Sequence, residues 1–197
     1  MAVERQTFDY LTELLVHFMP ISFSLQEKLK LIIFEEHHLG GTYILNNREI
    51  PIKSWIIIKG SAREFKTTKD YVGEQTQWFW FENEFIYTTP GFFSQQPAES
   101  YIEILEDSHL VCIDFQSFYS LKKTDPEAER LSELLRDQNQ RMINKYLNQL
   151  RTLNGKARYE LLFKVHPKLF NLAKQKDIAY FLGIVPDTLG KLRKNEK

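Results

Sequence analysis

The sequence predicts an α+β protein in which a β domain is followed by a long helix and a small helical domain. Short runs of β-branched and aromatic residues fill the region from about 34 to 114. A long amphipathic segment follows at about 127–150, and two short segments with helical apolar spacing lie near the end of the sequence. The 197 residues are 43% hydrophobic and 26% charged, which is typical of a globular protein with enough apolar material for a core.

Two amphipathic helices are expected at the N-terminus. Phe8, Leu11, Leu15 and Phe18 recur at steps of three and four, which predicts a helix over about 7–19 that ends before Pro20. Ser24, followed three residues later by Glu27, fits a capping box and predicts the start of a second, short helix.

Five short runs predict the strands of an all-β sandwich or barrel. They are separated by Gly, Asn, Pro and Asp turn residues and read GGTYILN, SWIIIKGSAREFK, QTQWFWFENEF, SYIEIL and HLVCID. Gly60 is expected to supply a positive-φ turn between two strands. QWFWF is apolar on both faces, which favours a covered strand over a platform for stacking nucleic-acid bases. Cys112 is the single cysteine, so no intramolecular disulfide can form, and we expect it to be a buried strand residue.

The next segment predicts one long helix. Asp125 suits the N-cap and Pro126 the first helical position. A helix ending near 150 would be about 36 Å long, and its apolar stripe is broad. We therefore expect one side to lie on the β domain and another to contact a second copy, while a helix packed wholly onto its own chain is the alternative. The candidate dimer residues on this stripe are Leu131, Leu135, Met142 and Tyr146.

Asn154 and Gly155 break this helical pattern, and a further helix is expected at about 156–165. The break divides the chain into three parts. Residues 1–124 contain the N-terminal helices and the β domain, residues 125–152 form the long helix, and residues 153–197 form the C-terminal helical domain.

The stretch DIAYFLGIVPDTLGKLRK, residues 177–194, fits a helix-turn-helix. Ala179 offers a small residue where two helices cross, and Gly183, four residues later, suits the turn between them. Pro186 favours a break before the second helix. The apolar residues at the inward positions of such a unit are Ile178, Leu182, Ile184, Leu189 and Leu192.

Charge is segregated along the sequence. Residues 1–150 carry 15 Lys and Arg against 22 Asp and Glu, whereas residues 151–197 carry 11 against 4. A basic segment of this kind suits a polyanionic partner, because lysine and arginine neutralise phosphates. A helical hairpin without a binding role is the alternative. The candidate DNA-binding residues are Lys174, Lys176, Asp187, Thr188, Lys191, Arg193 and Lys194.

These features, in this order, resemble the Crp/Fnr family of bacterial transcription regulators over nearly the whole chain, and in particular a shortened branch common in Bacteroidetes. The segments WIIIKGSARE and FENEF look like the family's jelly-roll strands beside its ligand pocket. The positions that match its recognition stretch are Asp177, Ile178, Ala179, Leu182, Gly183, Thr188, Leu189 and Gly190.

The resemblance implies an N-terminal β jelly roll like a cyclic-nucleotide-binding domain, a dimerisation helix and a C-terminal helix-turn-helix domain. It implies a homodimeric transcription regulator that binds double-stranded DNA and responds to a small-molecule effector. Three positions depart from the family pattern, because Pro186, Asp187 and Lys191 replace an arginine, a glutamate and an arginine. The sequence also ends at Lys197, which leaves little room for the family's wing. The alternative is a ligand-sensing or protein-interaction module that has lost sequence-specific DNA binding.

The effector pocket implied by the resemblance departs further from the family. Ile86 and Tyr87 occupy the place of its glycine–glutamate pair, and Glu99 and Ser100 that of its arginine–serine pair. A carboxylate in place of an arginine repels a cyclic phosphate, so we expect neither cyclic AMP nor cyclic GMP to bind in the usual way. Another effector, or simply side chains, would fill the pocket. The candidate lining residues are Phe85, Tyr87, Phe92, Phe93, Glu99, Ser100 and Tyr101.

Other classes of function are not expected. The sequence lacks a phosphate-binding glycine loop, a nucleophile elbow and a zinc-protease motif, so we do not expect an enzyme. One cysteine cannot hold an iron–sulfur cluster, and adjacent His37 and His38 point to opposite faces of a strand, so no cofactor or metal is expected. The sequence has no run of 18 apolar residues, so no membrane-spanning helix is expected. The N-terminus does not resemble a signal peptide, and a cytoplasmic location is therefore expected.

Overall fold

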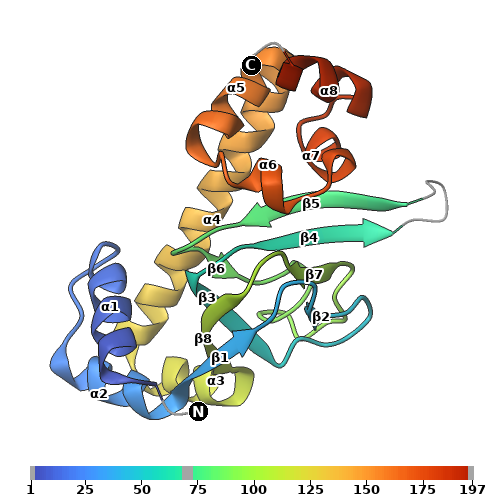
Figure 1. The fold of residues 1–197 in the computed structure, drawn as a ribbon. Coiled ribbons are helices and arrows are strands. Elements are labelled where there is room, and N and C mark those ends of the chain that lie inside the picture. The colour runs from blue at the N-terminus through green and yellow to red at the C-terminus, as the bar shows by residue number, and fades with distance from the viewer. Residues whose placement is uncertain (1–2, 68–72, 195–197) are drawn as a thin grey trace.

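The computed structural model describes residues 3–67 and 73–194, and it has the α+β architecture that the sequence predicts (Figure 1). Helices α1 (Arg5–Val16) and α2 (Phe23–Ile32) precede the β region. Helix α3 (Phe115–Thr124) and the long helix α4 (Pro126–Thr152) follow it. The chain then forms α5 (Gly155–Val165), α6 (Leu169–Leu172), α7 (Gln175–Phe181) and α8 (Pro186–Lys194). Figure 1 shows α4 running from the N-terminal helices at one end of the molecule to the C-terminal helices at the other.

Within the described residues, the strands form a jelly-roll sandwich of two four-stranded antiparallel sheets. One sheet has the order β1 (Ile33–His38), β8 (Ser108–Asp114), β3 (Lys53–Lys59) and β6 (Phe85–Ile86). The other has the order β2 (Tyr43–Leu45), β7 (Tyr101–Ile104), β4 (Ala62–Thr67) and β5 (Glu74–Trp80). Alternate residues of each strand point between the sheets, where they form an apolar core that includes Trp55, Ile57, Trp80, Ile102, Leu110 and Cys112.

Three local predictions for the β region are confirmed. Gly60, between β3 and β4, has φ 111°. A Cβ at this position would lie 2.0 Å from Ser108 Oγ and 2.9 Å from Ser108 Cα, so the turn needs glycine for space as well as for conformation. Cys112 is buried in β8, and Phe79 and Trp80 of the apolar β5 segment are buried.

A second apolar cluster fills the space between the N-terminal helices and the outer face of the β1–β8–β3–β6 sheet. Leu11 and Leu15 from α1 and Leu25 from α2 pack there against Ile56 and Val111 of the sheet. Helices α3 and α4, which follow the β region in the sequence, also pack on this cluster. The N-terminal helices are therefore an integral part of the jelly-roll region.

Three expectations for the helices are corrected. The first helix spans Arg5–Val16 and ends earlier than expected. The second is capped by Ser22 and not by Ser24, because Ser22 Oγ accepts from Leu25 N at 3.1 Å and donates to the Glu127 carboxylate of α4. Helix α3 was not expected. It begins directly after β8, where the Asp114 carboxylate accepts a hydrogen bond from Ser117 N.

The long helix has the predicted start and the predicted break at its end. Asp125 caps it by accepting from Glu127 N at 3.0 Å, and Pro126 is its first residue. Its 27 residues correspond to a length of about 40 Å. The next helix begins at Gly155, with Asn154 as its N-cap. In the part of the chain that the structure describes, no helix has both the length and the apolar character required to cross a membrane.

Candidate nucleic-acid interface

Helices α7 and α8 form two crossed helices joined by a tight turn at Gly183, as the sequence predicts. Gly183 has φ 62°, and its N–H donates to Tyr180 O at 2.9 Å. The N–H of Ile184 donates to Ala179 O at 3.0 Å. Together these two hydrogen bonds form a Schellman motif, which ends α7 with glycine in the left-handed conformation. The chain is then free to change direction and to start α8 at Pro186.

The predicted inward residues hold the two helices together. Ile178 and Leu189 are fully buried, and Leu182 is 3% exposed. Ile184 and Leu192 are partly buried against the same cluster, which also includes Phe170 and Tyr159 from α6 and α5. The starts of the two helices are joined by a hydrogen bond from Gln175 Nε2 to Pro186 O at 2.8 Å. The apolar spacing in the sequence therefore identified the core of the helix-turn-helix unit correctly.

The predicted DNA-binding residues lie on the outside of this unit. Lys174 and Lys176 are exposed at the start of α7, and Asp187, Thr188, Lys191 and Lys194 are exposed on α8, while Arg193 is half-buried. In the described part of the chain, none of these side chains forms an ion pair. Asp187 lies in the first turn of α8 and the cations lie in its last turn, which suits the helix dipole. These cations are therefore exposed on the outer side of the unit, although Glu74 and Asp177 lie near enough to Lys174 and Lys176 for their charges to interact.

A buried cluster of charges joins the helix-turn-helix unit to the jelly roll. Arg63 of β4 is 1% exposed and contacts three carboxylates, those of Glu74, Glu103 and Asp177. The nitrogen–oxygen distances are 2.7 Å to Glu74, 2.6 Å to Glu103 and 2.7 Å to Asp177. We call these four residues the Arg63 cluster. Because Asp177 belongs to α7, the cluster ties the first helix of the unit to strands β4, β5 and β7.

The Arg63 cluster contains one cation and three carboxylates, and these surroundings shift the pKa values of its two most buried members, Arg63 and Asp177. Burial alone would lower the pKa of Arg63, but its carboxylate neighbours outweigh burial and raise this pKa. Burial raises the pKa of Asp177, and the charges of Arg63 and Lys176 oppose this rise without cancelling it. The Arg63 Nη1 N–H is not aligned with the Asp177 carboxylate, so this contact is an ion pair without a hydrogen bond.

Aromatic side chains make a second contact between the two regions. The ring of Phe181, at the end of α7, lies 5.1 Å from that of Phe79 in β5 and 4.6 Å from that of Tyr146 in α4. The Tyr146 hydroxyl donates a hydrogen bond to Phe181 O. Burial raises the pKa of Tyr146 to about 12, so the phenol stays protonated and remains a donor. Sequence reasoning missed both Arg63 and Phe181 as contacts of this unit, because their partners are remote in the sequence.

The candidate dimer residues of α4 contact their own chain. Leu131 is 5% exposed, and both Leu131 and Leu135 pack in the N-terminal apolar cluster. Met142 and Tyr146 line a cavity between α4, α5 and the β5–β6 turn, with an empty volume of about 870 Å³ including its open mouth. An adjacent face of α4 carries Ile143, which is half-buried, and Leu147, which is 40% exposed.

Glu84 also lines the cavity at the junction of the two regions. Its carboxylate accepts a hydrogen bond from Phe81 N at 3.1 Å. Burial outweighs this hydrogen bond and raises the pKa of Glu84 to about 7. His166 lies in the same cavity and stacks on Phe81, and burial lowers the pKa of His166. The junction thus holds two titratable groups that burial keeps closer to neutral.

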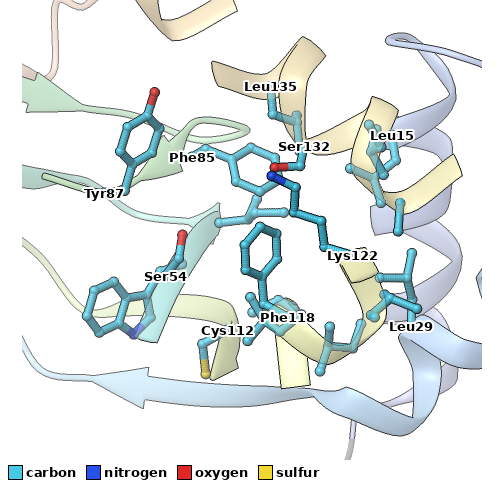
Figure 2. A pocket seen from close by; sticks show the side chains of 18 of the residues that line it. Leu15, Leu29, Ser54, Phe85, Tyr87, Cys112, Phe118, Lys122, Ser132 and Leu135 are labelled. Atoms are coloured by element: carbon cyan, nitrogen blue, oxygen red, sulfur yellow. The ribbon is translucent and has the colours of Figure 1, made fainter. Parts of the chain in front are cut away.

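Four of the candidate effector-pocket residues line one apolar cavity (Figure 2). It lies between α1, α2, α3, α4 and the outer face of the β1–β8–β3–β6 sheet, and its empty volume including the mouth is about 800 Å³. The four residues are Phe85, Tyr87, Phe92 and Phe93. Lys122 from α3 and Ser132 from α4 are among its few polar groups. The chemical character of this cavity suits an apolar molecule.

The other three candidate pocket residues do not line this cavity. Glu99 is exposed and pairs with Lys66 at 2.8 Å. Ser100 is buried and donates a hydrogen bond to the Glu64 carboxylate at 2.7 Å. The Tyr101 ring stacks on that of Phe65. These residues lead into β7, which belongs to the opposite sheet of the sandwich, so they cannot face the same side as Phe85 and Tyr87.

Comparison with known proteins identifies the fold. No protein-family model and no curated protein matches this sequence. The structure of FixK2 from Bradyrhizobium japonicum matches with a TM-score of 0.68 and 14% identity, over 83% of this chain and 84% of that chain. The c-di-GMP-responsive global regulator CLP of Xanthomonas campestris matches with a TM-score of 0.63 and 15% identity, over 86% and 88%. A candidate regulator of the Crp/Fnr family from Eubacterium rectale matches with a TM-score of 0.68 and 14% identity, over 91% and 87%. The chain therefore has the fold of Crp/Fnr regulators over most of its length.

Replacing Arg63 with methionine is expected to destabilise the protein strongly. Arg63→Met leaves the carboxylates of the Arg63 cluster without their buried cation, and removing one partner of a buried pair typically costs about 3–5 kcal/mol. Lys66→Met is the matched control, because Lys66 lies on the same strand but pairs with exposed Glu99, where solvent screens the two charges. Urea unfolding of both variants measures the difference. Equal effects of the two substitutions would contradict a central role for the cluster.

Replacing Glu84 with glutamine is expected to stabilise the protein at alkaline pH. The pKa of Glu84 is about 7 in the folded chain and near 4.5 when unfolded, so the unfolded state loses this proton first as pH rises. Folding stability therefore falls between about pH 4.5 and 7, and the loss is complete above pH 7. Glu84→Gln removes it, which corresponds to about 1–3 kcal/mol at pH 8 and nothing near pH 4. Urea unfolding across this pH range measures the effect, with Glu82→Gln at an exposed neighbouring position as the control. If Glu84→Gln changed the free energy of unfolding equally at every pH, the raised pKa of Glu84 would be contradicted.

Proposed function

We propose that this protein is a homodimeric, DNA-binding transcription regulator of the Crp/Fnr type, acting in the cytoplasm. The observation that carries the proposal is the division of α8 into two faces. Leu189 is buried in the core of the helix-turn-helix unit, while Thr188, Lys191 and Lys194 are exposed and unpaired within the described residues. In this proposal residues 1–124 form the sensing domain, 125–152 the dimerisation helix and 153–197 the DNA-binding domain.

The dimensions and chemistry of α8 support insertion into the major groove of duplex DNA. Its nine residues make a rod about 13 Å long, and the groove is about 12 Å wide. Lys174 and Lys176 at the start of α7, with Lys191 and Lys194 on α8, would contact phosphates and supply much of the affinity. Thr188 can hydrogen-bond a base edge. Lys191 presents a single ammonium group, whereas an arginine would present a planar guanidinium that can donate two parallel hydrogen bonds. We therefore infer that Lys191 contacts guanine in a different way from arginine.

A second copy of the chain would pack on the face of α4 that carries Ile143 and Leu147. These two residues are one helical turn apart, and Leu147 is exposed in the isolated chain. Leu131, Leu135 and Tyr146 support the proposal indirectly, because they fix the adjacent side of α4 to its own chain. Two copies of α4 packed in this way would present two α8 helices to successive half-sites of a palindromic DNA sequence.

We infer that the sensing domain does not bind cyclic nucleotides in the family's usual manner. Glu99 stands where a cyclic phosphate would need a cation, and its only ion pair in the described chain is with Lys66. Ser100, at the next position, is already engaged by Glu64. The cavity beside Phe85, Tyr87 and Phe92 favours an apolar effector. Pro186, in place of a base-reading arginine, favours the alternative that the chain senses a ligand without reading DNA.

The DNA-binding proposal predicts a specific effect of α8 substitutions. Duplex DNA selected by the protein from a random-sequence pool should bind in a fluorescence-anisotropy titration, and Lys191→Ala or Lys194→Ala should weaken it. Each substitution that removes one phosphate contact should reduce the slope of log K against log[salt] by about 0.9. Lys123→Ala is the control, because Lys123 is an exposed cation of α3, outside the helix-turn-helix unit.

The same titration separates the two candidate functions. Binding to DNA that is unchanged by added cyclic AMP is the expected result. Absence of any anisotropy change at low salt would favour the ligand-sensing alternative, and an affinity that rises with cyclic AMP would contradict the inference about the pocket.

The dimer proposal predicts that a charge at Leu147 produces monomers. Leu147→Asp places a carboxylate in the centre of the proposed apolar interface, where burying it unpaired costs several kcal/mol. Asn148→Asp adds the same charge one residue later, on an exposed position of another side of α4, and should leave the dimer intact. Size-exclusion chromatography with light scattering gives the mass directly. A monomeric wild type, or two variants with the same mass, would contradict the assigned face.

A further inference from the structure

Three metal-ligating side chains converge on the outer face of the β1–β8–β3–β6 sheet, away from the helix-turn-helix unit and outside the residues that line the apolar cavity. They are Glu35 and His37 of β1 and His109 of β8, and one ligand atom from each lies within 4.8 Å of the others. His109 Nε2 lies 3.0 Å from Glu35 Oε2. The rings of His37 and His109 are stacked with their centroids 4.4 Å apart.

The register of the sheet creates this arrangement. β1 and β8 are antiparallel, and His37 lies directly opposite His109. Directly opposed residues have Cβ atoms about 4.5–5.5 Å apart, which allows two imidazoles to share one ion. Glu35 is two residues before His37, so it points to the same face. The adjacent His38 points to the other face, where it contacts Glu36, and so it takes no part.

The carboxylate of Glu35 is held in place by groups behind it. Glu35 is 5% exposed, and its Oε1 accepts a hydrogen bond from the backbone N–H of Glu4 at 2.6 Å, while Oε2 faces His109. Such outer hydrogen bonds orient a ligand and are a regular part of metal sites.

We infer that Glu35, His37 and His109 form a binding site for a divalent transition-metal ion of the zinc class. Two imidazoles and one carboxylate match the donors that zinc prefers, whereas Ca²⁺ and Mg²⁺ select oxygen ligands. Ligand atoms around a tetrahedral zinc ion lie about 3.4 Å apart, given bonds of about 2.1 Å. Ligand atoms that lie up to 4.8 Å apart would have to approach by up to about 1.4 Å, which rotation of the exposed His37 side chain can provide. Solvent would supply the fourth ligand beside His37.

Bound metal would add a cross-link to elements that already pair through the sheet. It would bridge β1, the edge strand of its sheet, to β8, and through Glu4 and Thr7 it would fix the start of α1. This inference does not depend on DNA binding.

Titration of the metal-free, full-length protein with Zn²⁺ and Co²⁺ tests the site. Isothermal calorimetry should detect one equivalent of Zn²⁺, and Co²⁺ should give the visible absorption of a site with nitrogen and oxygen ligands. His37→Ala should lower the affinity for Zn²⁺ by roughly 100-fold or more, since loss of even an outer partner costs 10–100-fold. His37 is exposed, so this variant should fold.

His38→Ala is the matched control, because it removes the neighbouring histidine from the opposite face and should leave the affinity unchanged. A second variant, Glu35→Gln, should also weaken Zn²⁺ binding, and excess Mg²⁺ should not compete. Absence of saturable Zn²⁺ binding, or equal affinities for His37→Ala and wild type, would overturn the inference and leave the group as a hydrogen-bonded ion pair with a stacked ring.

Discussion

The position of the helix-turn-helix unit depends on a buried arginine whose positive charge must be paired with carboxylates. A guanidinium that is 1% exposed must be paired, because the uncompensated charge would cost several kcal/mol. Arg63 meets this requirement with carboxylates from two strands and one helix, and the helix is α7. Glu74 and Glu103 hold Arg63 within the jelly roll, so Asp177 is the member that joins the two regions. The aromatic contact of Phe181 with Phe79 and Tyr146 then fixes the angle of α7.

The long helix α4 contacts both the jelly-roll region and the helix-turn-helix unit. Near its start, α4 packs through Leu131 into the cluster beside the apolar cavity, and near its end it packs through Tyr146 against α7. A single rigid element therefore touches both the candidate sensing site and the candidate DNA-binding unit. Its second apolar face carries Ile143 and Leu147, and Leu147 is 40% exposed. The breadth of the apolar stripe in the sequence has a structural reason, because the stripe serves both of these contacts within the chain.

Local signals were predictable from the sequence, and pairings between remote segments were not. Asp125, Pro126 and Gly183 act within one turn of their own position, so their roles follow from spacing alone. Ser22 replaces Ser24 as a cap because it also bonds Glu127, more than a hundred residues away. The partner of Asp177 lies on β4, and the partner of His37 lies on β8, so both depend on the sheet topology. Four aromatics of the apolar cavity come from one segment and were found together, whereas Glu99 and Ser100 precede β7 of the opposite sheet and Tyr101 begins it.

The Arg63 cluster also explains how a basic surface coexists with an acidic body in one chain. The C-terminal segment, residues 151–197, has few acids, and Asp177 is one of them. Asp177 is buried against Arg63, whereas Lys174 and Lys176, which flank it in the sequence, stay exposed on α7. Two acids from the strands, Glu74 and Glu103, also contact the guanidinium of Arg63. One buried interaction thus orients the helix-turn-helix unit and leaves its outer face with excess positive charge, which is the electrostatic condition for attracting DNA.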